Sequence, residues 1–411
     1  MLLQKVRSVF DYKGIEKCVL AFSGGLDTTV IASLLSDMGI KPITVTLDMG
    51  TATRKSIQEV ERKAKLVGAR HYTIDAREEF LNEYIIPAIM ANSLYQGEYP
   101  NSTALSRPLI VKHLVDVARL ENAQAVAHGS TGKGNDQVRI DNGIRALAPE
   151  LRIIAPVRDW GLWRDEEIEY ARKKGLPVKA KKSIYSTDEN MWGRSIECGP
   201  IENPELEVPE DAYEWTVKPE KAPNKPEYVD ILFDAGKPVE CRIGGAAYRG
   251  IRLVEKLNEL AGAHGVGRIE HMEDRVIGFK SREAYEAPAA TVLLKAHKDL
   301  EKTILSKDEL EVKEYMDNVW TNLVYSGKWY TPLRKQVEAF IKETQKHITG
   351  RVRIKLFKGN ADVVARESKY ALYDKKTATY DKETTWNQKE GGIFTKIYGL
   401  EGVMAYRLRG E

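Results

Sequence analysis

The sequence predicts an α/β fold in which a doubly wound, mostly parallel sheet is followed by a second domain of mixed α+β structure. Two observations support this prediction. In the first part of the chain, short apolar segments alternate with amphipathic helical stretches, and beyond residue 179 proline-dotted and hairpin-like segments replace that alternation. The chain has 411 residues and 42% hydrophobic content, which suffices for two hydrophobic cores.

Five short segments of apolar or alternating character are the predicted strands of the sheet. They comprise residues 18–22, 43–47, 71–74, 125–127 and 153–155. A helix is predicted after the first strand, with Gly39 at its end and with apolar residues at helical spacing: Leu26, Val30, Ile31, Leu34 and Leu35. Because strands and helices alternate in this way, we expect the strands to run parallel.

The second part of the chain has a different pattern. Prolines are frequent between residues 200 and 226, and Val229, Ile231 and Phe233 then alternate before a predicted turn at Asp234-Ala235-Gly236. Further predicted elements are helices near residues 253–263, 310–324 and 332–346, and a hairpin over residues 353–364 with Gly359-Asn360 at its turn. The last stretch, residues 377–411, is polar apart from a short apolar segment at residues 393–404.

A glycine-rich turn joins the first predicted strand to the first helix, with the sequence Ser23-Gly24-Gly25-Leu26-Asp27-Thr28-Thr29. Glycine lets backbone N–H groups approach an anion, the helix start leaves donors unpaired, and the hydroxyl groups add more, so the turn suits a phosphate chain. A carboxylate in an anion site is expected where a divalent cation bridges it to phosphates, which makes Asp27 a candidate Mg²⁺ ligand. A simple helix cap is the alternative interpretation.

A second glycine-rich, densely polar loop at residues 128–139 follows the predicted strand at residues 125–127. Loops at the ends of neighbouring strands can share one crevice, so we expect the two loops to form one site. The first turn lacks both the G-x-G-x-x-G pattern and the Gly-Lys-Ser/Thr ending, and neither common nucleotide motif therefore fits.

The first turn resembles that of the N-type ATP pyrophosphatases. The second loop, together with residues 99–108, 186–195 and 265–285, is similar in order and spacing to the argininosuccinate synthase family, and the similarity covers most of the chain. It implies an adenine nucleotide α-hydrolase-like domain at residues 1–172, a synthetase domain at 173–375, and an oligomerisation segment at 376–411 that helps to form a homotetramer. An ordinary terminal flap is the alternative for this last segment.

The resemblance implies ATP-dependent C–N ligation of L-citrulline and L-aspartate in arginine biosynthesis. In the family reaction, the ureido oxygen of citrulline attacks the α-phosphorus of ATP and expels diphosphate. The aspartate amine then attacks the citrullyl-AMP intermediate, giving argininosuccinate and AMP. A ureido carbon is a poor electrophile with a poor leaving group, so activation must come first.

The resemblance also implies the site residues. Those for ATP are Ala21, Phe22, Ser23, Gly24, Gly25, Leu26, Asp27, Thr28, Thr29, Leu47 and Gly129. Those for citrulline are Tyr99, Thr103, Asn135, Arg139, Ser186, Ser195, Glu273 and Tyr285, and those for aspartate are Thr131, Asn135 and Asp136. Asp27 and Asp136 are the implied catalytic groups, Asp27 through Mg²⁺ held by the phosphates and Asp136 by orienting the attacking amine.

Several of these residues have a plainer interpretation when taken singly. Arg139 and Glu273 could be members of surface ion pairs, Tyr99 and Tyr285 could be aromatic residues at the edge of a core, and Leu47 could be a core residue. His128 is expected to be packed or hydrogen-bonded rather than catalytic. The chain also departs from the family pattern: Thr29 replaces a more usual serine, Ser130 a more usual alanine or cysteine, and Ala104 lacks a hydroxyl group.

Composition is compatible with an enzyme that acts on small molecules. The chain carries 63 basic and 60 acidic residues and no long basic run, so no nucleic-acid partner is expected.

Cys18, Cys198 and Cys241 lie far apart and form no Cys-x-x-Cys pair, which suits a reducing compartment and a role as small apolar residues. Residues 1–10 are too poor in apolar residues for a signal peptide, and no apolar run approaches a membrane span, so we expect a cytoplasmic protein without a membrane partner.

Two other classes of function remain as alternatives. Another ATP pyrophosphatase, such as a tRNA-thiolating enzyme or an amidotransferase synthetase, would share the first turn, but it should carry catalytic cysteines or a basic RNA-binding domain. Neither is apparent in the sequence. A non-catalytic nucleotide-sensing protein would keep the first turn and lose the residues for amino acids. The polar set at residues 131–139 argues against it.

Overall fold

The computed structural model describes residues 2–177 and 184–410, and residue 179, where the sequence pattern changes, lies outside this part. The first region contains a five-stranded parallel sheet with the order β3-β2-β1-β4-β5. Its strands are β1 (Lys17–Ala21), β2 (Lys41–Asp48), β3 (Arg70–Asp75), β4 (Ala125–Ala127) and β5 (Arg152–Ile154). All five strands were predicted, and their parallel pairing confirms the expected doubly wound sheet.

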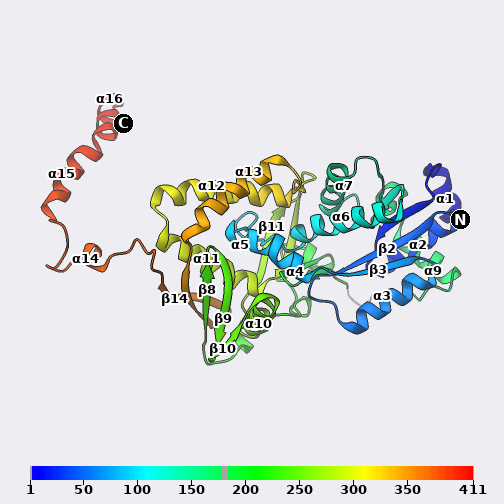
Figure 1. Ribbon diagram of the computed structural model, residues 1–411, viewed down its shortest axis with the longest axis horizontal. Coiled ribbons are helices and arrows are strands. Elements are labelled where there is room, and N and C mark those ends of the chain that lie inside the picture. The colour runs from blue at the N-terminus through cyan, green and yellow to red at the C-terminus, as the bar shows by residue number, and fades with distance from the viewer. Residues whose placement is uncertain (1, 178–183, 411) are drawn as a thin grey trace.

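Helices cover both faces of this sheet (Figure 1). They are α1 (Leu2–Val9), α2 (Leu26–Asp37), α3 (Arg54–Leu66), α6 (Ser102–Glu121), α7 (Asp136–Leu147) and α9 (Arg164–Lys173), with the short helix α8 at Pro156–Asp159. Cys18 and Leu20 of β1 pack in one apolar cluster with α2 and α9, whereas Val19 packs in another with α6 and α7. Alternate residues of the central strand β1 therefore pack into two hydrophobic cores, one on each face of the sheet.

The second region contains two antiparallel sheets. One has the order β10-β9-β8-β13-β14 and is built from β8 (Glu227–Asp234), β9 (Lys237–Ile243), β10 (Ala246–Tyr248), β13 (Gly350–Phe357) and β14 (Asn360–Glu367). The other has the order β11-β12-β7-β6 and is built from β6 (Ser186–Asn190), β7 (Gly193–Glu197), β11 (Arg268–Asp274) and β12 (Lys280–Glu286). The helices are α10 (Gly250–Ala263), α11 (Pro288–Ile304), α12 (Lys307–Tyr325) and α13 (Pro332–Thr344).

The predicted hairpins exist, with one correction to a turn. Ala235 and Gly236 link β8 to β9, and both have positive φ, as a two-residue hairpin turn requires. The turn between β13 and β14 consists of Lys358 and Gly359, with φ of 49° and 83°, rather than Gly359 and Asn360. Asn360 is already the first residue of β14 and pairs with Phe357, so the predicted turn was displaced by one residue.

One large hydrophobic core joins the two regions. The segment between β3 and the middle of α6 contains α4 (Arg77–Phe80), a π-helical turn (Leu81–Ile85) and α5 (Ile86–Met90). Its apolar side chains pack in the same cluster as those of α10 to α13 and of the five-stranded antiparallel sheet. Tyr84 of this segment stacks on Trp329, with ring centroids 4.6 Å apart. In Figure 1, α4 and α5 accordingly lie between the parallel sheet and helices α11 to α13.

The chain ends in an arm that reaches away from the body of the molecule (Figure 1). The arm contains α14 (Lys375–Ala378), α15 (Lys389–Tyr398) and α16 (Leu400–Arg409), and no residue of these helices is buried. Large apolar side chains are exposed along α15, among them Phe394, Ile397 and Tyr398.

Two of the three cysteines match the expected role of small apolar residues, whereas Cys198 does not. Cys18 and Cys241 are buried, and burial raises the pKa of each thiol, so both behave as small apolar residues. Cys198 is exposed. In the described part of the chain, no helix has the length and apolar character needed to cross a membrane.

Substitution of the core residue Phe80 tests the shared core. Phe80 is fully buried in the cluster that joins the two regions, so Phe80→Ala should lower the free energy of unfolding by about 3–5 kcal/mol, because it leaves a cavity. Urea denaturation followed by circular dichroism measures this change. As a control, Tyr315→Ala alters a side chain that is 68% exposed and should change stability by no more than about 0.5 kcal/mol. Equal effects of the two substitutions would contradict the shared core.

Candidate active site

The predicted phosphate loop leaves the carboxyl end of β1 and enters α2 at Gly25. Gly24 has φ of +69°, and a Cβ atom at this position would lie 3.1 Å from the side chain of Val60. Gly25 is the N-cap residue of α2, and no side chain caps this end of the helix. The N–H groups of the first helical turn are therefore available to a ligand, so the loop fits an anionic group.

Hydroxyl groups and one lysine surround this loop. The Ser23 hydroxyl lies 3.3 Å from that of Thr28, and Thr29 donates a hydrogen bond of 2.6 Å to the carbonyl of Gly25. Lys63 of α3 donates to the carbonyl of Gly24 at 2.7 Å. Its ammonium group places a positive charge beside the loop, a contribution that the sequence analysis missed because no motif marks this helical lysine.

The second loop lies directly against the first. Strands β1 and β4 are neighbours in the sheet, so the loops that follow them emerge side by side. A Cβ atom at Gly129 would lie 3.4 Å from the methyl group of Thr28 and 3.9 Å from Cβ of Asp27. A side chain at Gly129 would therefore be in ordinary van der Waals contact with the start of α2, and the two loops lie side by side where the strand order reverses.

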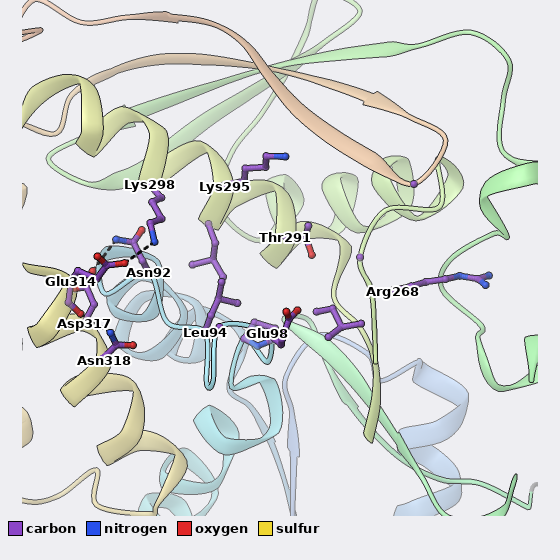
Figure 2. A pocket seen from close by; sticks show the side chains of 16 residues that line it. Asn92, Leu94, Glu98, Arg268, Thr291, Lys295, Lys298, Glu314, Asp317 and Asn318 are labelled. Atoms are coloured by element: carbon purple, nitrogen blue, oxygen red, sulfur yellow. Dashed lines mark hydrogen bonds and ion pairs between the residues drawn. The ribbon is translucent and has the colours of Figure 1, made fainter. Parts of the chain in front are cut away.

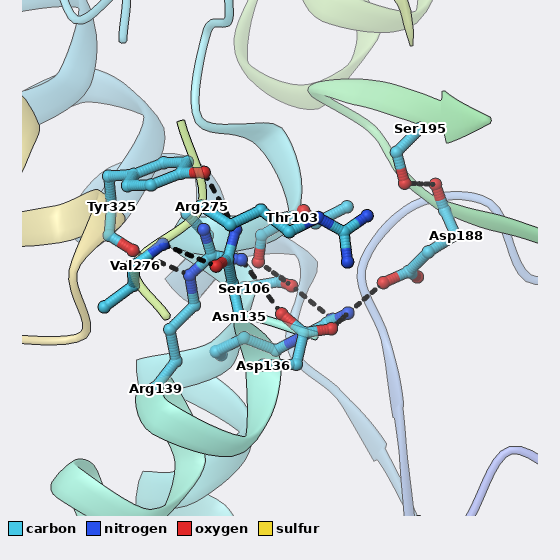
Figure 3. Close-up of polar contacts among 12 residues, drawn as sticks. Thr103, Ser106, Asn135, Asp136, Arg139, Asp188, Ser195, Arg275, Val276 and Tyr325 are labelled. Atoms are coloured by element: carbon cyan, nitrogen blue, oxygen red, sulfur yellow. Dashed lines mark hydrogen bonds and ion pairs between the residues drawn. The ribbon is translucent and has the colours of Figure 1, made fainter. Parts of the chain in front are cut away.

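A polar pocket opens where the second loop continues into α7 (Figure 3). Its walls come from the start of α6, the second loop, α7 and the four-stranded sheet. The lining residues are Tyr99, Thr103, Arg107, Gly134, Asn135, Asp136, Arg139, Asp188, Ser195, Glu197, Glu273, Arg275, Glu283 and Tyr285. Side chains from both regions of the chain therefore face one another across this pocket.

Most of the residues predicted to bind citrulline and aspartate line this pocket, but two do not. Ser186 begins β6, where it pairs with Glu197 of β7, and Thr131 is exposed on the second loop. Neither is among the lining residues. Of the residues predicted for the nucleotide, Ala21 and Leu47 lie at the carboxyl ends of β1 and β2, at the edge of the sheet where the first loop emerges.

Arg139 is held rigidly with part of its guanidinium group still unused. Its Nε donates to the carbonyl of Tyr325 at 2.9 Å, and its Nη1 donates to Asp136 at 2.9 Å. The guanidinium carbon lies 4.9 Å from the centre of the Tyr325 ring. Its Nη2 makes no hydrogen bond to another residue of the described chain, so one terminal nitrogen remains for a carboxylate ligand.

Glu273 is a buried carboxylate surrounded by hydroxyl donors. Tyr285 and Tyr325 each donate a short hydrogen bond to it, one to each oxygen. Burial would raise the pKa of Glu273, but hydrogen bonds from its neighbours outweigh burial and lower it. The carboxylate therefore stays ionised and presents a negative charge in the pocket opposite Arg139.

A further tyrosine, Tyr99, shapes the same wall. The ring of Tyr99 stacks on that of Tyr285 with centroids 4.3 Å apart. Its hydroxyl accepts hydrogen bonds from the N–H groups of Thr103 and Ala104 at 2.9 and 3.3 Å. Tyr99 thus caps the start of α6 with its hydroxyl group and lines the pocket with its ring.

Asp136 lies between two arginines (Figure 3). Arg107 of α6 donates to one carboxylate oxygen at 2.6 Å, and Arg139 donates to the other at 2.9 Å. Arg107 also pairs with Asp188 of β6. Burial would raise the pKa of Asp136, but the two guanidinium groups outweigh burial and hold it well below its usual range. Asp136 therefore stays ionised and is a weak base.

His128 has both ring nitrogens engaged. Its Nδ1 accepts the N–H of Ser130 at 3.2 Å, which fixes the proton on Nε2, and Nε2 donates to Asp141 at 2.9 Å. The ring is buried. The expectation that His128 is packed and hydrogen-bonded is thus confirmed.

A larger cavity of about 670 Å³ lies elsewhere (Figure 2) and shares no residue with the polar pocket. Two of its charged side chains, Lys298 and Glu314, pair with each other at 3.3 Å, and Asp317 pairs at 2.7 Å with Lys313, which does not line the cavity. None of the residues that the two glycine-rich loops present lines it. The smaller polar pocket, rather than this cavity, is the candidate active site.

The sequence did not reveal Arg107 and Arg275, which line the pocket, or Tyr325, which holds Asn135 and Glu273 there. Arg107 lies within the predicted motif region but inside a helix, and Tyr325 and Arg275 reach the pocket from the far end of α12 and from the turn between β11 and β12. No spacing signal links these positions to the second loop. In the described residues, no cluster of three or more His, Cys, Asp and Glu side chains is arranged to hold a metal ion.

Comparisons with known proteins place this site in a family. The family model described as "Arginosuccinate synthase N-terminal HUP domain" matches residues 17–177, and the one described as "Arginosuccinate synthase C-terminal domain" matches residues 185–405. The chain belongs to the argininosuccinate synthase family. The resemblance seen in the sequence is thereby confirmed.

Curated argininosuccinate synthases are similar to this chain over nearly its whole length. The enzyme of Pyrococcus furiosus is 54% identical over 394 residues, covering 95% of each chain. That of Pyrobaculum aerophilum is 49% identical over 399 residues, covering 96% of this chain and all of the relative. That of Bacillus subtilis is 49% identical over 387 residues, covering 94% and 95%. Argininosuccinate synthases are ligases, so membership also identifies the chain as an enzyme.

Gly327 offers a test of how Arg139 is positioned. Gly327 has φ of +70°, and a Cβ atom there would lie 2.7 Å from Cα of Arg139. Gly327→Ala should therefore displace Arg139 and weaken the binding of citrulline, its expected ligand, by about tenfold or more, as for the loss of one charged hydrogen bond. Isothermal titration calorimetry measures this. The control is Gly14→Ala, which has φ of +77° but no atom within 4 Å. Unchanged citrulline affinity in Gly327→Ala would contradict this role.

Proposed function

We propose that this protein catalyses the ATP-dependent ligation of L-citrulline and L-aspartate through a citrullyl-AMP intermediate, releasing AMP and diphosphate and forming argininosuccinate. One observation supports this above all. Gly129 of the second loop lies beside the start of α2, where a Cβ atom would be 3.4 Å from the methyl group of Thr28, and the same loop lines the polar pocket from Gly134 onward. A triphosphate on the first loop and an amino acid in the pocket would therefore meet along one short stretch of backbone. ATP is the co-substrate of this family.

The first loop would hold the diphosphate end of ATP. Its glycines, the uncapped start of α2 and the hydroxyl groups of Ser23 and Thr28 provide donors for phosphate oxygens. Asp27 is half-buried in the first turn of α2, where it would bind a Mg²⁺ ion carried by the phosphates. Bound Mg²⁺ would neutralise charge on the departing diphosphate.

Citrulline would lie between Arg139 and Glu273. The free Nη2 of Arg139 suits its α-carboxylate, and the ionised Glu273 suits its ammonium or ureido N–H groups. The stacked rings of Tyr99 and Tyr285 would form an apolar wall along the aliphatic part of the substrate. The site thus combines two opposite charges with a flat surface between them.

Aspartate would bind beside Asp136, at the second loop. Because two arginines keep Asp136 ionised, this carboxylate would attract and orient the amine of aspartate rather than remove its proton. Thr131 and Asn135 would add contacts from the same loop. Positioning of the nucleophile would then supply much of the catalysis.

We further propose domain limits and an assembly. The parallel sheet corresponds to a nucleotide-binding domain at residues 1–172, the antiparallel sheets to a synthetase domain at 173–375, and the arm to an oligomerisation segment at 376–411. The arm exposes Phe394, Ile397 and Tyr398 without any contact that buries them. Such apolar surface is typical of a segment that packs against another copy, and a homotetramer is the proposed assembly.

A product assay tests the reaction. With ATP, Mg²⁺, citrulline and aspartate, the purified protein should release diphosphate and AMP only when both amino acids are present. Asp27→Ala should abolish diphosphate release while leaving the circular dichroism spectrum unchanged, because the metal would lose its protein ligand. As a control, Asp116→Ala removes a surface carboxylate of α6 and should retain activity. Full activity in Asp27→Ala would refute the metal role, and no release by the unmodified protein would refute the function.

Light scattering tests the arm. The full chain should have the mass of four subunits, and Phe394→Glu should shift it toward smaller species because a charge would be placed in the apolar contact. Lys396→Glu, which changes a neighbouring polar residue of α15, is the matched control and should leave the assembly intact. A monomeric full chain would contradict the proposed assembly.

A further inference from the structure

The turn between β11 and β12 contacts the second loop from the opposite side of the pocket. Val276 in this turn donates its backbone N–H to the side-chain oxygen of Asn135 at 2.9 Å. The amide nitrogen of the same asparagine donates to the Tyr325 hydroxyl at 2.8 Å (Figure 3). Asn135 is thus fixed by groups that lie more than a hundred residues further along the chain.

Arg275 makes the second contact of this turn with the loop. Its Nη1 donates to the backbone carbonyl of Lys133 at 3.1 Å. Lys133 and Asn135 lie just before Asp136 in the chain, with Gly134 between them. The turn therefore holds the segment that carries Asp136. A shift of this segment would move the Asp136 carboxylate away from its place between the two arginines.

The guanidinium group of Arg275 is itself locked in place. Its Nε donates to Ser281 at 2.7 Å, and its Nη2 donates to Glu197 at 2.9 Å and to Glu283 at 2.6 Å. Every nitrogen of the group is therefore used, and only Nη1 points at the loop. The fixed fork of arginine can satisfy these partners together, whereas the single nitrogen of lysine cannot.

We propose that Arg275 is a positioning residue for the second, aspartate-dependent half of the reaction: it holds the Lys133–Asn135 backbone so that Asp136 presents its carboxylate to the incoming amine. The inference rests on the proposed function. Arg275 also lines the pocket, and it acts on Asp136 through the backbone of the second loop. Arg139 is anchored separately, by the carbonyl of Tyr325 and by the close approach of Gly327. Because these two anchors do not involve Arg275, Arg275→Ala should impair the aspartate-dependent half more strongly than the citrulline-dependent half.

Two assays separate the halves of the reaction. Exchange of labelled diphosphate into ATP with citrulline alone reports adenylation, and AMP formation at varied aspartate concentration gives the KM for aspartate. Arg275→Ala should raise the KM for aspartate about tenfold or more, as for the loss of a charged hydrogen bond, and should reduce citrulline-dependent exchange by a clearly smaller factor. A KM for aspartate that stays unchanged would overturn the proposal.

Arg282 provides the matched control. It lies on β12, and its guanidinium group is also buried and bound to a carboxylate, Glu270, and to the carbonyl of Asn203, but it does not touch the second loop. Arg282→Ala should affect the stability of the sheet without a selective change in the KM for aspartate. Equal changes in both assays for Arg275→Ala and Arg282→Ala would mean a general structural role and would also overturn the proposal.

Arg275→Lys distinguishes the contact with the loop from the ion pairs. Lysine keeps a positive charge near Glu197 and Glu283, so stability should return to near that of the unmodified protein. The KM for aspartate should remain raised, because one nitrogen cannot serve both carboxylates and the carbonyl of Lys133. Recovery of both properties would show that charge alone suffices and would contradict the proposed geometry.

A measurement independent of catalysis keeps the inference separate from the proposed function. Hydrogen–deuterium exchange of the segment 129–136 should become faster in Arg275→Ala and remain unchanged in Arg282→Ala. Unchanged exchange in Arg275→Ala would overturn the proposed contact even if the protein is fully active. Absence of citrulline-dependent exchange of diphosphate in the unmodified protein would instead refute the function, while the protection of the loop would still report on Arg275.

Discussion

The arrangement of the pocket depends on one hydrophobic core that two regions of the chain share. The segment from α4 to the first half of α6 belongs by sequence to the region of the parallel sheet, yet its apolar side chains pack with α10 to α13 and with the antiparallel sheet. Tyr99, Thr103 and Arg107 lie within this segment. Because interiors are close-packed and deform little, the walls of the pocket are fixed relative to one another before any ligand binds.

Within those fixed walls, each charged side chain named here is paired with an opposite charge or a hydrogen-bond donor. Arg107 and Arg139 bracket Asp136, two tyrosine hydroxyl groups hold Glu273, and two glutamates hold Arg275. A buried charge without partners would cost several kcal/mol, so this pairing is what makes so polar a pocket compatible with a stable fold. It also means that a charged substrate meets side chains already oriented for it, which lowers the cost of reorganisation on binding.

The sequence alone predicted the parallel sheet, both glycine-rich loops and the hairpins, because each has a local signal of period or turn chemistry. It did not reveal the four-stranded sheet. Strands β6, β7, β11 and β12 are rich in charged residues, a composition typical of loops. Their buried charged side chains are stabilised by ion pairs, such as that between Arg194 and Glu286 at 2.9 Å. The same reason explains why Arg107, Tyr325 and Arg275 escaped detection: partners distant in sequence determine their roles, and no local pattern encodes such pairs.

The strand order has a consequence for how the protein folds during its synthesis. The two glycine-rich loops lie side by side because β1 pairs with β4. This pairing joins Cys18 to Ala125, which lies more than a hundred residues later in the chain. Closing so long a loop costs about 4 kcal/mol of chain entropy, which local contacts cannot offset. On a translating ribosome, the glycine turn after β1 would emerge early and remain without its neighbour until β4, about a hundred residues later, had been made. A functional segment that is synthesised early thus acquires its final surroundings only after a strand distant in sequence has formed.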